Sequence, residues 1–218
     1  MIEYQLILSN RRTLSICVDL EGALVVRAPL KTPRREIEAF LTQKQSWIEE
    51  KQKLAQLRRI FSPQDGGSMP WMDGMLKIRR ADVRAPERRD DVLYVPMEGE
   101  LYPWLRQWRM QKAKEILPPR VAMWSEKTGI PFGKLTFGQA RKRWGSMNSS
   151  GDLRLNAALL HCPVGLIDYV IVHELCHALH FDHSPAFHAS VRSFLPDAEE
   201  RRKILKACSL YTTLLHSD

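Results

Sequence analysis

The sequence predicts an α+β fold in which a strand-rich N-terminal part precedes a mostly helical C-terminal part. Short β-rich runs occupy residues 4–27 and return beyond a loop near residue 65. From Leu101 onward, apolar residues recur mainly at helical spacing. Strands grouped ahead of helices are typical of α+β proteins, whereas regular alternation would indicate a parallel α/β sheet.

Three strands and one helix are expected at the start of the chain. The strands are β-rich runs separated by turn residues: 4–8, 14–18 and 23–27. Thr32 is expected to cap the helix, with Pro33 at its first position and the end near Leu57. Two or three further strands should follow between Met69 and Val95, where the arginine-rich stretch 79–89 predicts an exposed hairpin.

The sequence predicts helices around a few short strands in the second part of the chain. A helix from Leu101 should stop near Leu117 because Pro118-Pro119 follows, and a second helix should run to Thr128. Strands are expected at 134–137 and 152–156, ahead of the helices. We therefore predict residues 1–98 as a strand-rich region with one helix and residues 99–218 as the catalytic domain.

Composition places the chain among ordinary globular proteins. Apolar residues make up 44% and charged residues 27%. No apolar stretch is long enough to span a bilayer, and no export signal is evident, which predicts a cytoplasmic protein without a membrane partner. The scattered cysteines Cys17, Cys162, Cys176 and Cys208 are expected to be reduced. The net charge of +8 permits a nucleic-acid partner, but without an RNA-binding or helix-turn-helix signature this is not favoured.

The segment His173-Glu174-Leu175-Cys176-His177 carries the clearest chemistry. Residues four apart on a helix share one face, so His173 and His177 can hold one metal ion. Glu174 lies beside the pair and can act as general base toward a water that zinc activates. The neighbouring helix is apolar, and ionisable side chains are costly to bury without a partner, which favours a metal site over chance.

A catalytic zinc commonly has three protein ligands, and His183 is the preferred third one. It should lie in a short turn, because Ser184-Pro185 is a typical helix start. The alternatives are His180, His188 or an acid within residues 197–200. His161 and His216 lack a partner pattern and are expected at the surface.

Several motifs together resemble the YgjP-like metallopeptidase family, a branch of the zincin-like hydrolases related to SprT-like and M48-type metallopeptidases. They are Arg143-Trp144-Gly145-Ser146, Leu153-Arg154-Leu155-Asn156, Asp168-Tyr169-Val170, the segment 173–177 and His183-Ser184-Pro185-Ala186-Phe187. The resemblance is specific from about residue 102 to 206. Met147 and His188 stand where many relatives have cysteine and tryptophan, and the second departure keeps the third-ligand assignment open.

The resemblance implies a zincin-like helical domain with a small edge sheet, in which His173, His177 and His183 bind zinc and Glu174 is the catalytic acid/base. It also implies that strand 153–156 is the sheet edge beside the cleft, where a peptide could pair. The expected function is therefore a zinc-dependent, metallopeptidase-like hydrolase.

Two other functions stay open. The family is also associated with nucleoside triphosphate pyrophosphatase activity on UTP, which Arg141, Lys142 and Arg143 could support by binding phosphates. Alternatively the metal is structural and the protein is a non-catalytic binding module, although such a module has no need of Glu174.

Overall fold

The computed structural model describes residues 3–19, 22–60, 64–140 and 142–214; within 50–60 and 207–214 it describes the backbone and only some side chains. Contacts between Cα atoms divide the chain into two compact units, Met1–Ser62 and Pro63–Asp218. This division lies earlier than the boundary at 98/99 that the sequence suggested. The sheet formed by residues 68–96 therefore belongs to the same unit as the later helices, while the limits of the catalytic domain stay a prediction.

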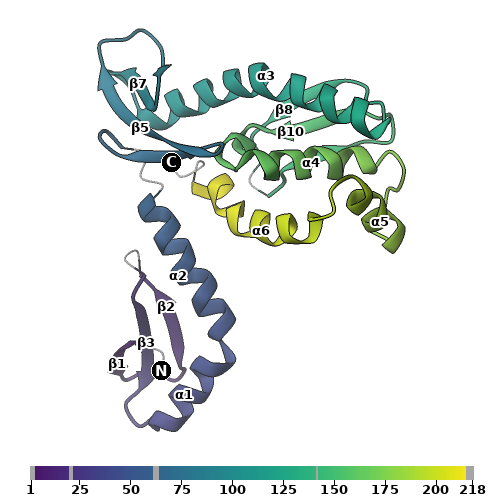
Figure 1. The fold of residues 1–218 in the computed structure, drawn as a ribbon. Coiled ribbons are helices and arrows are strands. Elements are labelled where there is room, and N and C mark those ends of the chain that lie inside the picture. Colours follow the sequence, from purple (N-terminus) through teal and green to yellow (C-terminus); the bar gives the residue numbers. More distant parts are fainter. Residues whose placement is uncertain (1–2, 20–21, 61–63, 141, 215–218) are drawn as a thin grey trace. The chain divides into compact units, whose positions relative to one another are not determined.

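The first unit contains a three-stranded sheet and two helices (Figure 1). Its elements are β1 (Gln5–Ser9), β2 (Ser15–Val18), β3 (Leu24–Pro29), α1 (Arg34–Gln43) and α2 (Gln45–Ile60). The central strand β3 pairs in parallel with β1 and antiparallel with β2. Leu24 and Val26 are two residues apart on β3 and so share one face of the sheet, and Ile37 and Leu41 lie one turn apart on α1. All four belong to one buried cluster. The three expected strands are confirmed.

The first helix differs from the expectation in two ways. It breaks at Lys44, whose N–H bonds to the carbonyls of Phe40 and Leu41, so that α1 and α2 are separate helices. Thr32 is not the cap, because Pro33 is the N-cap residue and no side chain bonds to the first turn. Thr32 instead closes a turn by donating its N–H to the Pro29 carbonyl.

The second unit starts with a four-stranded sheet of order β4-β5-β7-β6. Its strands are β4 (Ser68–Trp71), β5 (Gly74–Ala81), β6 (Glu87–Arg89) and β7 (Val92–Pro96). The expected arginine-rich hairpin is wrong: β5 and β6 do not pair with each other, because both pair with β7, which lies between them. Leu76, Ile78, Leu93 and Val95 are buried, whereas most arginines of the stretch are exposed; Arg80 is partly buried and donates to the Pro96 carbonyl.

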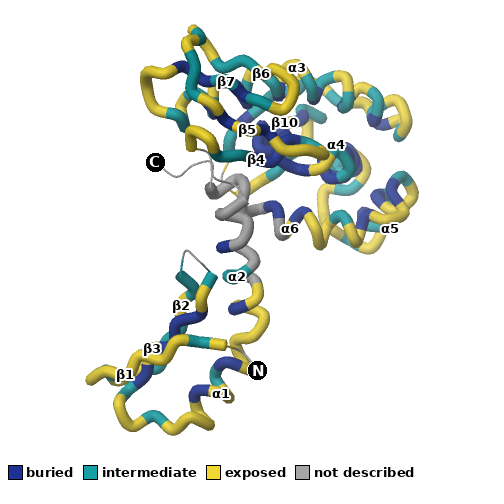
Figure 2. The backbone as a smooth tube through the Cα atoms, turned by 60° about the vertical axis from the view of Figure 1, so that its left-hand side comes forward, coloured by how far each residue is buried: buried dark blue, intermediate teal, exposed yellow. Residues whose placement is uncertain are grey.

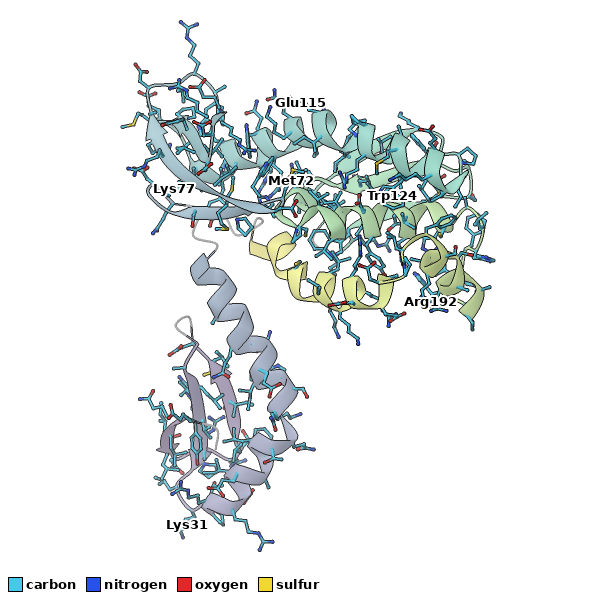
Figure 3. The ribbon with its side chains drawn as sticks, viewed as in Figure 1. Lys31, Met72, Lys77, Glu115, Trp124 and Arg192 are labelled. Atoms are coloured by element: carbon cyan, nitrogen blue, oxygen red, sulfur yellow. The ribbon has the colours of Figure 1, made fainter. Side chains whose placement is uncertain are left out.

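The helix α3 (Leu101–Thr128) runs without interruption through Pro118 and Pro119, contrary to the two helices expected. Proline lacks the N–H that would bond to the carbonyl four residues earlier. The buried face is nevertheless continuous across this point, since Ala113, Leu117 and Val121 follow one another at single turns. Packing of that face keeps the chain helical, and Glu115 lies on the exposed side (Figure 3).

A second, three-stranded sheet follows, with order β8-β10-β9. Its strands are β8 (Leu135–Gly138), β9 (Gly145–Met147) and β10 (Leu153–Asn156). The central strand β10 pairs in parallel with β8 and antiparallel with β9. The expectation that strand 153–156 forms the edge is therefore wrong. Leu153 and Leu155 are fully buried, which suits a central strand, and β9 takes the edge beside α4.

The remaining elements are η1 (Ala157–His161), α4 (Val164–Cys176), α5 (Pro185–Phe194) and α6 (Ala198–Leu214). The helix α4 is buried over most of its length and contacts α3, α5, α6, β9 and β10 (Figure 2). Arg120 of α3 and Asp168 of α4 fix the two helices together through two hydrogen bonds of 2.5 and 2.7 Å. Among the described helices, none has the length and apolar character needed to cross a bilayer.

Candidate metal centre and its cleft

Three histidine side chains converge at the end of α4. His173 lies in its last turn, His177 is its C-cap residue, and His183 lies in the turn that leads to α5. One ring nitrogen from each lies within 4.8 Å of the others, and the Nε2 atoms of His173 and His183 are 3.2 Å apart. The spacing on α4 brings the first two together. The third returns because Ser184 caps α5 by accepting a hydrogen bond from the Phe187 N–H.

Phe187 packs against all three histidine rings and is itself fully buried. Its ring centroid lies 4.8 Å from that of His173, 4.6 Å from that of His177 and 5.0 Å from that of His183. The ring of His177 is stacked on it. Phe187 therefore restricts the orientation of the imidazoles, a role that sequence reasoning did not assign.

The protonation of the histidines suits metal binding, because a metal ligand must be a neutral imidazole. Burial, followed by the charges of His177 and His183, lowers the pKa of His173 to about 3. Burial also lowers the pKa of His177, against the opposing effect of the hydrogen bond that the His180 carbonyl accepts from its ring. That bond joins the His180 oxygen to His177 Nδ1 at 3.0 Å and leaves Nε2 for a metal. The donor set thus fits a divalent transition metal.

The alternative third ligands fall into two groups. Only His188 is near: its ring centroid lies 6.3 Å from that of His183, and it lines the same cleft. Asp197 pairs with Arg201 and Glu199 with Arg202, and the cleft lining includes neither His180 nor any acid of 197–200. His188 is thus the alternative that lines the cleft beside His183, while the converging ring nitrogens are those of His173, His177 and His183; the third ligand stays a prediction.

Glu174 is buried beside the triad, with 7% of its surface exposed. Burial raises the pKa of its carboxyl to about 7, against the opposing effects of the Met147 N–H, which donates a hydrogen bond to it, and of nearby Arg143. Its side chain also lies directly against Gly145. A Cβ atom at Gly145 would be 2.7 Å from Glu174 Cγ and 2.8 Å from Oε1. The position of the carboxylate therefore depends on β9 as well as on α4.

The strand β9 uses one of its edges to pair with β10. Asn156 donates its N–H to the Trp144 carbonyl at 2.8 Å, and Asn148 donates its N–H to the Asp152 carbonyl at 3.1 Å. In an antiparallel pair, residues alternate between facing the partner strand and facing away from it. Ser146, midway between these two bonds, therefore also faces β10.

Gly145 and Met147 consequently turn their backbone N–H and C=O groups away from β10. The Met147 N–H meets Glu174, so this second edge of the strand faces α4. Among the described residues, no other strand pairs with the Gly145 N–H or with the carbonyls of Gly145 and Met147.

Asn156 holds the segment that leads into β9. Its side-chain Nδ2 donates to the carbonyls of Ala140 and Arg143, each at 2.7 Å, and its Oδ1 accepts from the Ala158 N–H at 2.9 Å. The side chain is 3% exposed. Asn156 thereby connects the end of β10 to the segment that carries Arg143 and Trp144, which the sequence alone did not reveal.

A cleft of about 570 Å³ opens over the triad and Glu174. Beside the histidines, its walls include Arg143, Trp144, Tyr169 and Arg202. Burial raises the pKa of the Tyr169 hydroxyl, which keeps this side chain neutral. Arg143 is thus in the cleft as the phosphate-binding hypothesis requires, Lys142 does not line it, and Arg141 lies outside the described residues.

His161 is not at the surface, contrary to expectation. It is 1% exposed, and its Nδ1 lies 2.7 Å from the Pro70 carbonyl. Burial, with a smaller effect of Arg109, lowers its pKa to about 3. His216 lies outside the described residues. None of the described cysteines forms a disulfide, and Cys176 is a buried core residue, as expected.

Three converging imidazoles and a buried glutamate in an open cleft define the class of a metal-dependent hydrolase. The comparison with protein families agrees: the model of the YgjP-like, metallopeptidase domain matches residues 12–208. The chain belongs to this family, as its motifs suggested. No curated protein and no solved structure matches the chain.

Proposed function

We propose that the protein is a zinc-dependent hydrolase that cleaves peptide bonds, with His173, His177 and His183 as metal ligands and Glu174 as general base. The observation that carries the proposal is the convergence of three ring nitrogens within 4.8 Å next to a buried carboxylate. Family membership supports a hydrolase that uses a metal.

Zinc is the metal that this donor set suits best. Neutral imidazoles are common zinc ligands, and three protein ligands with one open position are typical of catalytic sites. A zinc ion held there would supply a water molecule whose pKa is lowered to about 7 and a positive charge that polarises a carbonyl group.

Glu174 is placed to take a proton from that water and to give it to the leaving amine. Burial raises the pKa of its carboxyl to about 7, which makes it a stronger proton acceptor than an exposed glutamate, while a bound zinc ion would act in the opposite direction. The Met147 N–H fixes one side of the carboxylate. A base of this kind typically contributes about 10²–10⁴-fold in rate.

The β9 edge supports a peptide as substrate. An added strand gains backbone hydrogen bonds from Gly145 and Met147, and its carbonyls then run beside the triad. Strand addition is independent of side-chain identity, so that selectivity must come from the pockets beside the strand.

Nucleotide hydrolysis is the second candidate, and Arg143 and Arg202 support it, since both line the cleft. Guanidinium groups bind phosphate oxygens well. The unpaired backbone edge, which a nucleotide does not need, favours the peptide.

The test is an assay of the zinc-loaded protein against a peptide library and a panel of nucleoside triphosphates, with Glu174→Gln as the matched variant. We expect Glu174→Gln to keep its zinc and its melting temperature while losing at least about 10²-fold in turnover. Peptide cleavage that persists in this variant would refute Glu174 as base. Cleavage of nucleotides alone would replace the proposed substrate, and no hydrolysis of either would favour a non-catalytic module.

A further inference from the structure

A second pocket, of about 250 Å³, lies on the other face of the sheet that carries β9. Its polar lining residues include Arg143, Ser146, Arg154 and Asn156, of which Asn156 is already bonded to the carbonyls of Ala140 and Arg143. Ser146 and Arg154 are register partners on β9 and β10, so they project from the same face. The alternate residues Leu153 and Leu155 are buried on the opposite face. We call this cavity the Arg154 pocket.

Gly138 makes room for the arginine in this pocket. A Cβ atom at Gly138 would lie 2.7 Å from Arg154 Nε and 2.8 Å from its Nη2, closer than real contacts allow. The guanidinium therefore lies over the end of β8, on the exposed face of the sheet. A glycine at the end of a strand thus gives the arginine a defined position.

The Arg154 pocket is positively charged. Neither Arg143 nor Arg154 forms a salt bridge with a carboxylate in the part of the chain that the structure describes. Arg143 influences Glu174 only as a nearby charge. Two guanidinium groups in one cavity suit a carboxylate, to which arginine can donate two parallel hydrogen bonds.

The Arg154 pocket adjoins the cleft over the metal centre. The two cavities share the segment 143–146, and β9 runs between them. Successive side chains of an extended peptide point to opposite faces of the sheet that it joins. A peptide on the β9 edge therefore directs alternate side chains toward the triad and toward Arg154.

We propose that the Arg154 pocket is a specificity subsite that binds an acidic side chain of the peptide substrate. The inference rests on the proposed function in one respect, namely that an extended peptide pairs with β9. A glutamate or aspartate of the substrate would supply a carboxylate as salt-bridge partner for Arg143 and Arg154. Ser146 adds a hydroxyl donor on the same face.

The test measures peptide binding to the zinc-loaded Glu174→Gln protein, which does not require turnover. The probes are fluorescently labelled ten-residue peptides of alanine, serine and glutamine, each with one glutamate at a different position. We expect glutamate at one position to tighten binding about tenfold or more over the peptide without glutamate, since hydrogen bonds to charged groups are the strong ones. Adding Arg154→Gln should abolish this gain, and adding Arg154→Glu should transfer the preference to lysine at that position.

Arg192→Gln is the charge-matched control, because Arg192 is exposed on α5 and lines neither cavity (Figure 3). It should retain the full glutamate preference. The inference would be overturned if glutamate tightened peptide binding at no position, or if the tighter binding persisted in Arg154→Gln. Nucleoside triphosphate binding that depends on Arg154, without any preference for acidic peptides, would also overturn it. An Arg154-dependent preference in a protein that cleaves no peptide would uphold this subsite and refute the proposed function.

Discussion

Adding one methyl group at Gly145 tests how strictly β9 positions the general base. The new Cβ atom would lie 2.7 Å from Glu174 Cγ and 2.8 Å from Oε1. Ordinary contacts between carbon atoms require about 3.5 Å, so the glutamate side chain or β9 must move by roughly 0.8 Å. Catalytic groups need to be held within about 0.5 Å, and a misplacement of about 1 Å can cost about 10²-fold in rate.

We therefore expect Gly145→Ala to lower kcat by about 10- to 100-fold while zinc content is unchanged. The assay is steady-state kinetics on the best peptide, with metal analysis and thermal unfolding of the same sample. Gly165→Ala is the matched control. A Cβ atom there would meet Arg201 Nη1 at 3.4 Å, which the end of a flexible side chain can accommodate, and alanine favours the helix. Normal turnover by Gly145→Ala would refute the view that β9 fixes Glu174.

Three further predictions concern the metal, the Asn156 network and the thiols. His183→Ala should lose most of its zinc by elemental analysis, whereas full occupancy together with zinc loss in His188→Ala would reverse the ligand assignment. Asn156→Asp removes both amide hydrogen bonds to the carbonyls of Ala140 and Arg143. Steady-state kinetics should show kcat/KM lowered about tenfold or more, with unchanged zinc content. Wild-type kinetics would refute the view that Asn156 positions the segment leading into β9. Thiol titration should find four reactive groups after denaturation, whereas in the native protein only exposed Cys17 should react readily. Burial raises the pKa of the Cys176 thiol to about 11, which keeps this thiol protonated below that pH. Finding two groups after denaturation would indicate a disulfide.

The parts of the site that follow from local geometry could be predicted from the sequence. His173 and His177 are one helical turn apart, and the capping serine at Ser184 ends the turn that brings His183 back. Each of these relations spans a few residues. Helical periodicity and capping patterns report directly on such short-range structure.

The surroundings of Glu174 could not be predicted in this way. Gly145 and Met147 approach it from a strand far away along the chain, and no spacing in the sequence indicates that approach. The burial of His161 could not be predicted either, because its partner Pro70 lies in β4, about ninety residues earlier in the chain. Long-range packing also determines the order of the second sheet, where the family resemblance implied that strand 153–156 is the edge. It likewise keeps α3 continuous, where Pro118-Pro119 suggested a break.

The backbone of β9 sets a limit on how this protein can bind a peptide. Since Glu174 takes the Met147 N–H, an added strand can bond to the Gly145 N–H and to the carbonyls of Gly145 and Met147. Each such bond contributes a net free energy of only about 0.5–1.5 kcal/mol. The loss of translational and rotational freedom on association costs about 4–15 kcal/mol, so strand pairing alone cannot hold a substrate. The remaining free energy must come from the metal and from side-chain pockets, and two pockets flank β9, one on each face of the sheet. If the substrate is a peptide, as proposed, strand pairing would serve mainly to set its register, while the pockets would determine which peptides bind.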